Sequence, residues 1–267
     1  MKLEDLDQTK ITLFDLYSEA PGHAFSPSTW KVRYALNFKK LPFVTDWVDF
    51  IQVQSLCAQI GAKPTIKKPD GGDIWTLPVI YDPSTKRVVS ESLVIAEYLE
   101  QQYPSAPRLI PPGTEGLIRA FVHAFTKDVM PLYQFVIPLT IKVVKEESKP
   151  YFRATREAWF GTTLEEAVPK GEKRVEEWSK VKDVWKVFGR WFGDSDEDVE
   201  VGSEGTLRKW VMGDAPCFAD FLVAAHLMWV TKVLGQESEE WKEISKWSGG
   251  RWGRLLEDCK VYEGDYL

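Results

Sequence analysis

Cysteine and histidine are scarce in this sequence, with three of each among 267 residues. Cys57, Cys217 and Cys259 stand far apart and form no C-x-x-C pair. This spacing argues against the disulfide frameworks of small secreted domains and against cysteine-rich zinc modules. The histidines are equally dispersed, so no cluster of metal ligands can be read from the sequence. We therefore expect a protein without a metal centre.

Long apolar runs and an excess of positive charge are also missing. No stretch approaches the roughly 20 consecutive apolar residues that a membrane helix needs. The N-terminus, MKLEDLDQTK, has no apolar segment of the kind found in secretory signals. The net charge of -6 argues against a nucleic-acid partner, which requires a dense basic surface. We expect a cytoplasmic protein that binds neither nucleic acid nor membranes.

The first part of the chain alternates between strand-like and helix-like patterns. Residues 92, 95, 96, 99 and 103 recur at the spacing of one helix face. The order read from residues 11 to 103 is β-α-β-α-β-β-α. The expected strands are 11–17, 43–48, 77–81 and 87–89, and the expected helices start at 26–27, 52 and 92. The polar segment 63–73 is expected to be a loop.

A proline-rich segment at 104–113 separates this part from a region of helical patterns only. The expected helices are 114–145, bent at Pro131 and Pro138, then 171–192, 218–234 and 236–256. The apolar run 218–234 is the expected central buried helix, and the acidic stretch 193–205 is an expected loop. The sequence therefore predicts an α/β domain over residues 10–104 and an all-α domain over residues 112–267.

A proline beside a strand gives the first indication of function. Pro78 lies in the run T-L-P-V-I, where a missing N–H does not suit a central strand. A cis bond between Leu77 and Pro78 would leave the backbone of Leu77 free to pair with an extended peptide. The alternative is an ordinary proline at the edge of a sheet.

The pair Glu91-Ser92 opens the helix that follows the last strand. Unpaired N–H groups and the partial positive charge at a helix start favour a ligand carboxylate. Ser92 would donate to that carboxylate, and Glu91 would accept from a ligand ammonium group. The alternative is that both residues only cap the helix.

The third indication is Ser26, which precedes Pro27 at the start of the first helix. A thiol has an ordinary pKa of about 8.5 and is mostly protonated at neutral pH. A hydroxyl that donates to the sulfur, together with the helix terminus, would favour the thiolate. The alternative is that Ser26 is only the helix cap, and Ser28 is a competing donor.

Taken together, these segments resemble the cytosolic glutathione transferases. The element order, the L-P-V-I strand, the E-S helix start and the helical second half all match that family. The resemblance implies a thioredoxin-like first domain followed by an all-helical second domain. The run A-P-C-F-A-D resembles the capping motif of the second domain, although Cys217 replaces the usual serine or threonine.

The run S-P-S-T-W-K-V-R-Y-A-L-N-F-K, which begins at Ser26, resembles more narrowly the fungal-specific class A, related to etherases. It is also similar to the C-P-F motif of omega-type enzymes, with Ser26 in place of their cysteine. A serine cannot form mixed disulfides, so this resemblance implies a serine-type enzyme and argues against a disulfide oxidoreductase.

The resemblance implies glutathione as co-substrate, no metal, a homodimer and Ser26 as the catalytic residue. The implied glutathione contacts are Ser28, Lys67, Trp75, Thr76, Leu77, Pro78, Glu91 and Ser92, with Lys68 in reach of the same role as Lys67. Each lysine could equally be a solvated surface side chain. A cleft between the domains would take the second substrate, with walls from Tyr17, Phe25, Phe121, Phe125 and Trp229.

The abundance of tryptophan, with 12 residues, is explained mainly by a core rich in large rings, and it also suits aromatic ligands. The expected function is conjugation of glutathione to aromatic or other apolar electrophiles, or peroxide reduction. Ether cleavage is a narrower variant. The alternative is a ligand carrier for aromatic compounds with little turnover, because a fold alone does not establish activity.

Overall fold

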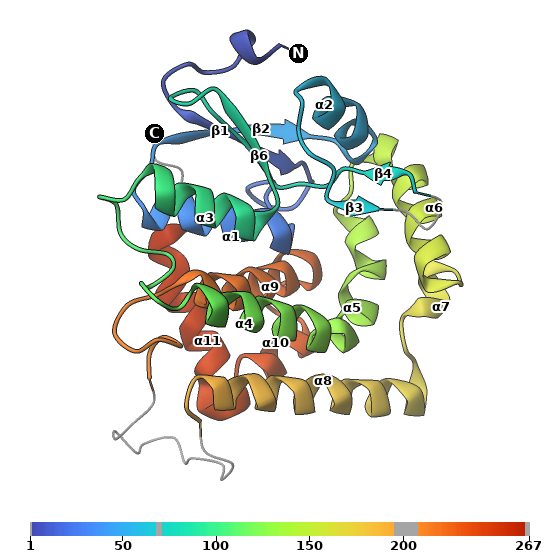
Figure 1. The fold of residues 1–267 in the computed structure, drawn as a ribbon. Helices are drawn as coiled ribbons and strands as arrows, with labels where there is room; N and C mark the ends of the chain where they lie inside the picture. The colour runs from blue at the N-terminus through green and yellow to red at the C-terminus, as the bar shows by residue number, and fades with distance from the viewer. Residues whose placement is uncertain (1, 68–70, 195–207, 265–267) are drawn as a thin grey trace.

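The computed structural model describes residues 2–67, 71–194 and 208–264. Its first half is built on a four-stranded sheet with the order β2-β1-β5-β6 (Figure 1). β1 and β2 run parallel, and β5 pairs antiparallel with both β1 and β6. The strands are β1 (Ile11–Leu16), β2 (Phe43–Val48), β5 (Val79–Asp82) and β6 (Arg87–Ser90).

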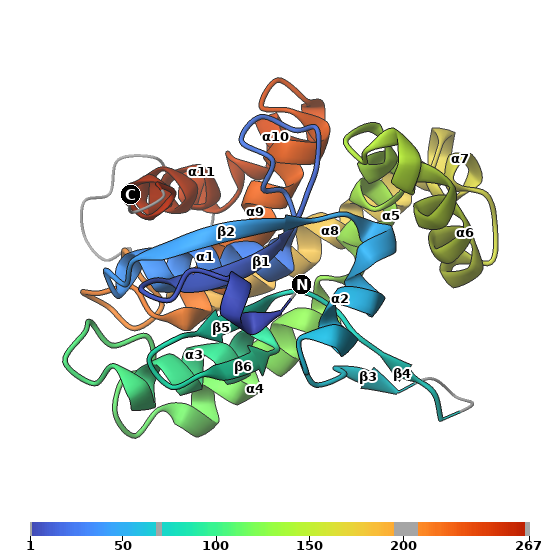
Figure 2. The same ribbon diagram turned by 90° about the horizontal axis from the view of Figure 1, so that it is seen from above.

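Helices cover both faces of this sheet (Figures 1 and 2). α1 (Pro27–Phe38) and α3 (Ser92–Gln102) lie on the face toward the helical half, and α2 (Val53–Gln59) lies on the opposite face. Each face has its own apolar cluster, because the side chains of a strand alternate between the two sides. The predicted β-α-β-α-β-β-α order is confirmed, and the arrangement is thioredoxin-like.

The sheet also holds α1 through a buried ion pair. The guanidinium of Arg33 lies 3.1 Å from a carboxylate oxygen of Asp15 on β1 and donates to the hydroxyl of Thr45 at 3.0 Å. Both charged side chains are almost fully buried. A buried charge is tolerated only when it is paired in this way, so the pair fixes how α1 lies on the sheet.

Two sequence boundaries in this half needed correction. The strand expected at 77–81 begins only at Val79, because the Leu77–Pro78 bond is cis and precedes the ladder. The segment 63–73 is not only a loop, since β3 (Ile66–Lys67) pairs antiparallel with β4 (Asp73–Ile74). Two-residue strands are too short to give a periodic signal in the sequence.

The second half contains helices in every region where the sequence predicted them, but with more breaks. The region 114–145 forms three segments, because Pro131 and Pro138 each lie at the start of a new one. The segments are α4 (Glu115–Asp128), α5 (Met130–Val136) and the 3₁₀-helix η3 (Pro138–Lys142). Two helices that the sequence did not predict follow them, α6 (Lys149–Phe160) and α7 (Leu164–Ala167).

The remaining helices lie close to the expected bounds. They are α8 (Gly171–Trp191), α9 (Phe218–Leu234), α10 (Glu239–Ile244) and α11 (Trp247–Cys259). The helix expected over 236–256 is divided, with left-handed backbone at Ser248, Gly249 and Gly250. Most of the acidic stretch 193–205 lies outside the described residues.

The two halves share a core where α9 packs against α1 (Figure 1). Phe221 stacks on Tyr34 with ring centroids 5.6 Å apart and meets the edge of Phe38 at 5.5 Å. The linker is held by Glu100, whose carboxylate accepts from the Leu109 N–H at 2.9 Å and from the Lys39 ammonium at 2.8 Å. The halves are therefore joined by buried aromatic packing and not only by the chain.

Candidate functional site

The Leu77–Pro78 bond is cis, which confirms that expectation. The Leu77 side chain packs into the cluster beneath α2, and the residue is 5% exposed. Within the described residues, neither the N–H nor the C=O of Leu77 has a hydrogen-bond partner. An unpaired backbone segment at the end of a strand can accept an added peptide strand.

Ser26 lies at the start of α1 with extended backbone, and Pro27 occupies the first helical position. Its carbonyl accepts from the Trp30 N–H at 3.0 Å and from the Thr29 hydroxyl at 3.1 Å. The Ser26 hydroxyl, in contrast, makes no capping hydrogen bond and has no partner in the described part of the chain. The capping alternative therefore does not account for this hydroxyl.

Ser28, the competing donor, is half-buried one residue after Pro27. Its hydroxyl also makes no hydrogen bond to a described residue. Both hydroxyls thus lie at the positive end of α1, where the unpaired N–H groups favour an anion. The geometry does not by itself separate the two.

Glu91 and Ser92 interact with each other and with α3. The Glu91 carboxylate accepts from the backbone N–H groups of Leu93 and Val94, both at 3.1 Å, so the capping alternative holds for this side chain. Ser92 donates to the other Glu91 oxygen at 3.1 Å. Glu91 has a φ of 78°, which is a costly conformation for a residue with a side chain. Such strain is found at binding sites more often than elsewhere.

Three further candidates are engaged within the protein. The exposed Lys67 forms an ion pair with Asp73 on β4, and Lys68 lies outside the described residues. The indole N–H of Trp75 donates to the Ala62 carbonyl at 2.8 Å. The hydroxyl of Thr76 is 2.7 Å from that of Thr65. Lys67 therefore matches the surface alternative, and the Trp75 N–H is already used.

The aromatic residues expected in the second-substrate cleft differ in burial. Phe125 has no exposed surface and stacks on Phe188 at 4.5 Å, so it belongs to the core of the helical half. Phe25 and Trp229 are 3% and 4% exposed. Phe121 is half-buried against Trp191, and Tyr17 is half-buried against His23.

An aromatic group that the sequence analysis missed surrounds Trp229. The ring of Tyr133 on α5 lies 5.4 Å from Trp229 and 6.3 Å from Trp159 on α6. Trp159 is 50% exposed, so this group extends from the core to open space. Burial raises the pKa of the Tyr133 hydroxyl. The sequence carried no usable signal, because α6 itself was not predicted.

A second missed residue is Lys31, on the same face of α1 as Pro27 and Ser28. Its ammonium group lies within electrostatic reach of Glu91 at the start of α3 and of His226 on α9. Burial lowers the pKa of Lys31 to about 8, and the charge of Glu91 opposes this shift. The spacing of three residues from Ser28 was the available signal.

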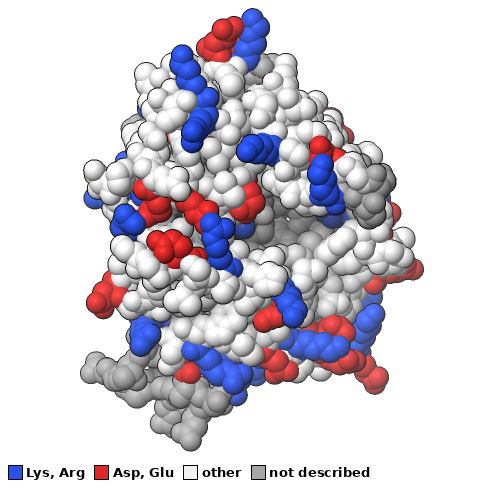
Figure 3. Space-filling view, viewed as in Figure 1, with Lys and Arg blue, Asp and Glu red and all other residues white. Residues whose placement is uncertain are grey.

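The space between the halves is open on one side. Figure 3 shows a hollow below the β3–β4 hairpin, bordered by α4 and α5. Among the described residues, no group of three or more His, Cys, Asp or Glu side chains is arranged to hold a metal ion. Within the same ranges, every helix is too short or too polar to cross a membrane.

A thioredoxin-like sheet joined to a helical domain, with a cis-proline at the strand edge, defines the class of glutathione-transferase folds. Models of protein families, matched to the sequence, agree with this class of fold. The glutathione S-transferase N-terminal domain matches residues 25–102, and the C-terminal domain matches residues 116–262. The chain belongs to the glutathione S-transferase family, and it is a glutathione transferase.

Solved structures of fungal enzymes are similar over nearly the whole chain. One is the glutathione S-transferase CsGST63524 of Ceriporiopsis subvermispora, solved in complex with glutathione. It is 37% identical, with a TM-score of 0.87 over 96% of this chain and 98% of that one. GSTFuA3 from Phanerochaete chrysosporium is 36% identical, with a TM-score of 0.86 over 97% and 99%.

Among curated proteins, the glutathione S-transferase-like protein ustS of Aspergillus flavus is 26% identical. The match covers 93% of this chain and 89% of that protein. The similarity thus includes both halves and the joint between them.

Proposed function

We propose that this enzyme activates the thiol of glutathione through the hydroxyl of Ser26. The observation that carries the proposal is that this hydroxyl, at the start of α1, has no partner among the described residues. A donated hydrogen bond and the helix terminus both stabilise a thiolate more than a thiol. A pKa lowered by about two units would make the thiolate the major form at neutral pH.

Glutathione would lie as an added strand against the unpaired backbone of Leu77, beside Pro78. Its γ-glutamyl end would reach Glu91 and Ser92 at the start of α3. The Ser92 hydroxyl, which donates to Glu91 in this structure, would then donate to the ligand carboxylate instead. The fungal relative solved with glutathione supports this co-substrate. The proposal assigns glutathione binding to residues 10–104 and the second-substrate wall to residues 112–267.

The thiolate would attack an aromatic or other apolar electrophile, or a peroxide. In the second case, two glutathione molecules supply the two electrons that reduce the peroxide to an alcohol and water. The match to GSTFuA3 supports the narrower assignment to the fungal class A, serine-type enzymes. We also propose a cytoplasmic homodimer, which sedimentation of the purified protein would test.

The test of the catalytic residue compares Ser26→Ala with Ser28→Ala. Loss of the donor at residue 26 should lower kcat/KM by about tenfold to a hundredfold, since a hydrogen bond to a charged group contributes about 1.5–3 kcal/mol. The pH–rate profile should shift to higher pH, while the Kd of glutathione changes little.

Ser28→Ala is the matched control because it removes a hydroxyl two residues away. If Ser28→Ala shifts the pH profile and Ser26→Ala does not, Ser28 is the donor. If neither variant shifts it, a hydroxyl does not activate the thiol and the proposal is wrong.

A second candidate function is a glutathione-dependent carrier of aromatic ligands. The aromatic group of Tyr133, Trp159 and Trp229 favours it, because a flat ligand can stack on aromatic side chains without any chemistry. Tryptophan fluorescence would report such binding, and assays with several electrophiles would report turnover. Tight binding without turnover of any electrophile would favour the carrier.

A further inference from the structure

One half-buried cation on α6 has no acidic partner. The guanidinium of Arg156 lies 5.3 Å from the centroid of the Phe152 ring, one helical turn away. Among the described residues, no carboxylate forms an ion pair or hydrogen bond with it. Burial lowers the pKa of Arg156, and an electrostatic influence of Tyr151 opposes this shift. A desolvated guanidinium without a counter-charge is a ready site for an anion.

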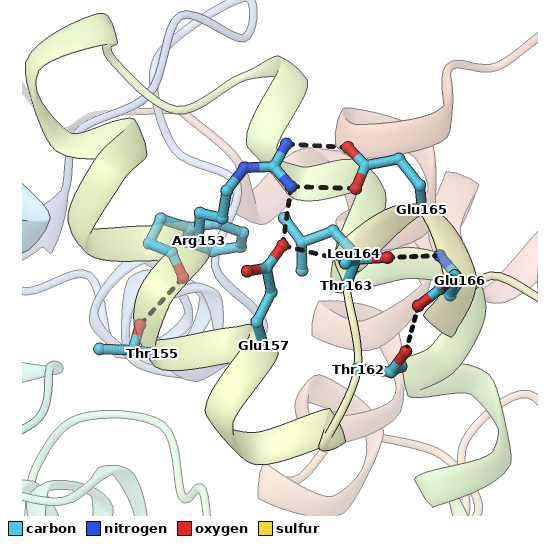
Figure 4. A network of polar contacts seen from close by, with 9 residues as sticks. Arg153, Thr155, Glu157, Thr162, Thr163, Leu164, Glu165 and Glu166 are labelled. Carbon is cyan, nitrogen blue, oxygen red and sulfur yellow. Dashed lines mark hydrogen bonds and ion pairs between the residues drawn. The ribbon is translucent and has the colours of Figure 1, made fainter.

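The acidic residues nearby already form ion pairs or hydrogen bonds with other side chains. Arg153 donates to Glu157 at 2.8 Å and to Glu165 at 2.8 and 3.0 Å, and these contacts tie α6 to α7 (Figure 4). Thr162 holds the carboxylate of Glu166 at 2.6 Å. The acids of the α6–α7 turn thus neutralise Arg153, whereas Arg156, one turn further along the same helix surface, forms no ion pair with a described residue.

Aromatic rings lead from Arg156 in two directions. Phe152 meets Phe50 edge-on at 5.4 Å, and Phe50 lies 6.1 Å from Phe25, the residue before Ser26. This chain of contacts connects α6 with the start of α1. Since α6 contacts the segment that follows β2, Arg156 lies where the two halves meet.

In the other direction, Trp159 follows Arg156 by three residues and therefore neighbours it on the helix surface. The Trp159 ring lies beside the Tyr133 ring, and the Tyr133 ring in turn meets the Trp229 ring edge-on. Figures 1 and 2 place α5, α6 and α7 together at one end of the helical half. The unpaired cation thus has flat aromatic surfaces beside it, half of one of them open to solvent.

We propose that Arg156 binds the carboxylate of an aromatic acid, whose ring lies against Trp159 and Tyr133. Aromatic carboxylates would then be the preferred second substrates. The planar guanidinium can hold both oxygens of a carboxylate, and the neighbouring rings can stack on the substrate. The inference rests on the proposed function, because it assigns a substrate class to the same cleft.

The test uses 4-chloro-3-nitrobenzoate and its neutral amide, 4-chloro-3-nitrobenzamide, as matched electrophiles. In both, the glutathione sulfur forms a bond to the carbon that carries chlorine. The carbon–chlorine bond then breaks, chloride leaves with the electron pair, and the thiol proton goes to solvent. The two substrates differ only in the charged group, so the ratio of their kcat/KM values measures recognition of the carboxylate, once corrected for their intrinsic reactivity with free glutathione.

For the wild-type enzyme, we expect the corrected ratio to favour the acid by about tenfold or more, as for a charge-assisted pair in a half-buried site. Arg156→Met should bring the ratio to about one or below. Arg156→Lys, which keeps the charge but loses the planar fork, should retain part of the preference. Arg119→Gln removes the same charge from an exposed side chain on α4 that pairs with Glu97, and it should keep the wild-type ratio.

Equilibrium binding separates this inference from the proposed function. The probes 3-nitrobenzoate and 3-nitrobenzamide cannot react, and quenching of tryptophan fluorescence reports their Kd. Tighter binding of the acid by the wild type, lost in Arg156→Met, supports the inference even if no electrophile is turned over. Equal affinity for acid and amide overturns it. A raised Kd of glutathione in Arg156→Met, with no effect on the acid, also overturns it and assigns the guanidinium to glutathione.

Discussion

At the scale of single residues, the polar side chains of this cleft differ in whether the protein already satisfies them. The Trp75 N–H and the Lys67 ammonium are engaged with protein partners. The Ser26 hydroxyl and the Arg156 guanidinium have no hydrogen-bond partner in the described ranges. The Ser28 hydroxyl is likewise without a partner there. A polar group that is shielded from water and has no partner is costly, so we expect ligand contacts from these side chains.

His226 on α9 allows a prediction about pH. It is 4% exposed, packs against Phe125, and its Nδ1 lies 2.9 Å from the Leu222 carbonyl oxygen. Burial lowers its pKa to about 3, and the charge of Lys31 adds to this effect. The unfolded chain binds the proton near pH 6.5, so stability is full above that pH and falls as the pH drops toward 3.

Between pH 7.5 and 5.5, this residue should cost about 1.3 kcal/mol of the free energy of unfolding. Urea denaturation of the wild type and of His226→Leu at both values would measure it. The difference between the two proteins isolates the histidine, because other titrating groups are common to both. If the free energy of unfolding changes equally with pH in both proteins, the loss of stability is not caused by protonation of His226.

At the scale of elements, the start of α9 depends on a buried cap. Asp220 has no exposed surface, and its carboxylate accepts from the N–H groups of Cys217 and Val211, both at 2.8 Å. Burial raises the pKa of Asp220 to about 6, and these hydrogen bonds oppose the shift. The aspartate therefore stabilises the start of α9 although Cys217 replaces the hydroxyl residue usual in the family.

Removal of this cap should be strongly destabilising. Asp220→Ala leaves the buried N–H of Cys217 and the half-buried N–H of Val211 without partners, at about 1–3 kcal/mol for the buried group and less for the other. Thr163→Ala removes an exposed cap, the hydroxyl that accepts from Glu166 at the start of α7, and should cost about 1 kcal/mol or less. Chemical denaturation of both variants tests this contrast, and equal losses would contradict it.

At the scale of the whole molecule, the packing of α1 against α9 joins the two halves into one cooperative structure. Phe221 is fully buried and contacts Tyr34, Phe38 and Tyr262 from three sides. The same helix α1 carries Ser26 at its start. The position of the proposed catalytic hydroxyl relative to the helical half is therefore set by this interface.

Phe221→Ala should lower the free energy of unfolding by about 3–5 kcal/mol, because it opens a cavity at the joint. Far-ultraviolet circular dichroism and tryptophan emission should still report one transition in the wild type, since the halves share the core. Two separate transitions in the wild type would show that the halves unfold independently. Leu117→Ala, at an exposed position on α4, is the control and should change little.

The sequence alone determined the order of the longer elements in the first half, because that order depends on local signals, whereas β3, β4, α6 and α7 were not predicted. The aromatic and β-branched run of β2, the Ser26-Pro27 helix start and the apolar run of α9 were all read within a residue of their observed bounds. The functional class also followed from short runs whose order along the chain is specific. The breaks in the helical half were less visible, since a 3₁₀ turn and an α-helix share most of their residue pattern.

Only the tertiary structure decided which of the candidate side chains are free. Glu91, Lys67 and Trp75 were all candidate ligand contacts in the sequence, and each has a partner brought by folding. The group around Tyr133 and the unpaired Arg156 arise from helices distant in sequence that meet at the cleft. The physical reason is that pairing and burial are properties of neighbours in space, and the sequence specifies those neighbours only through the complete fold.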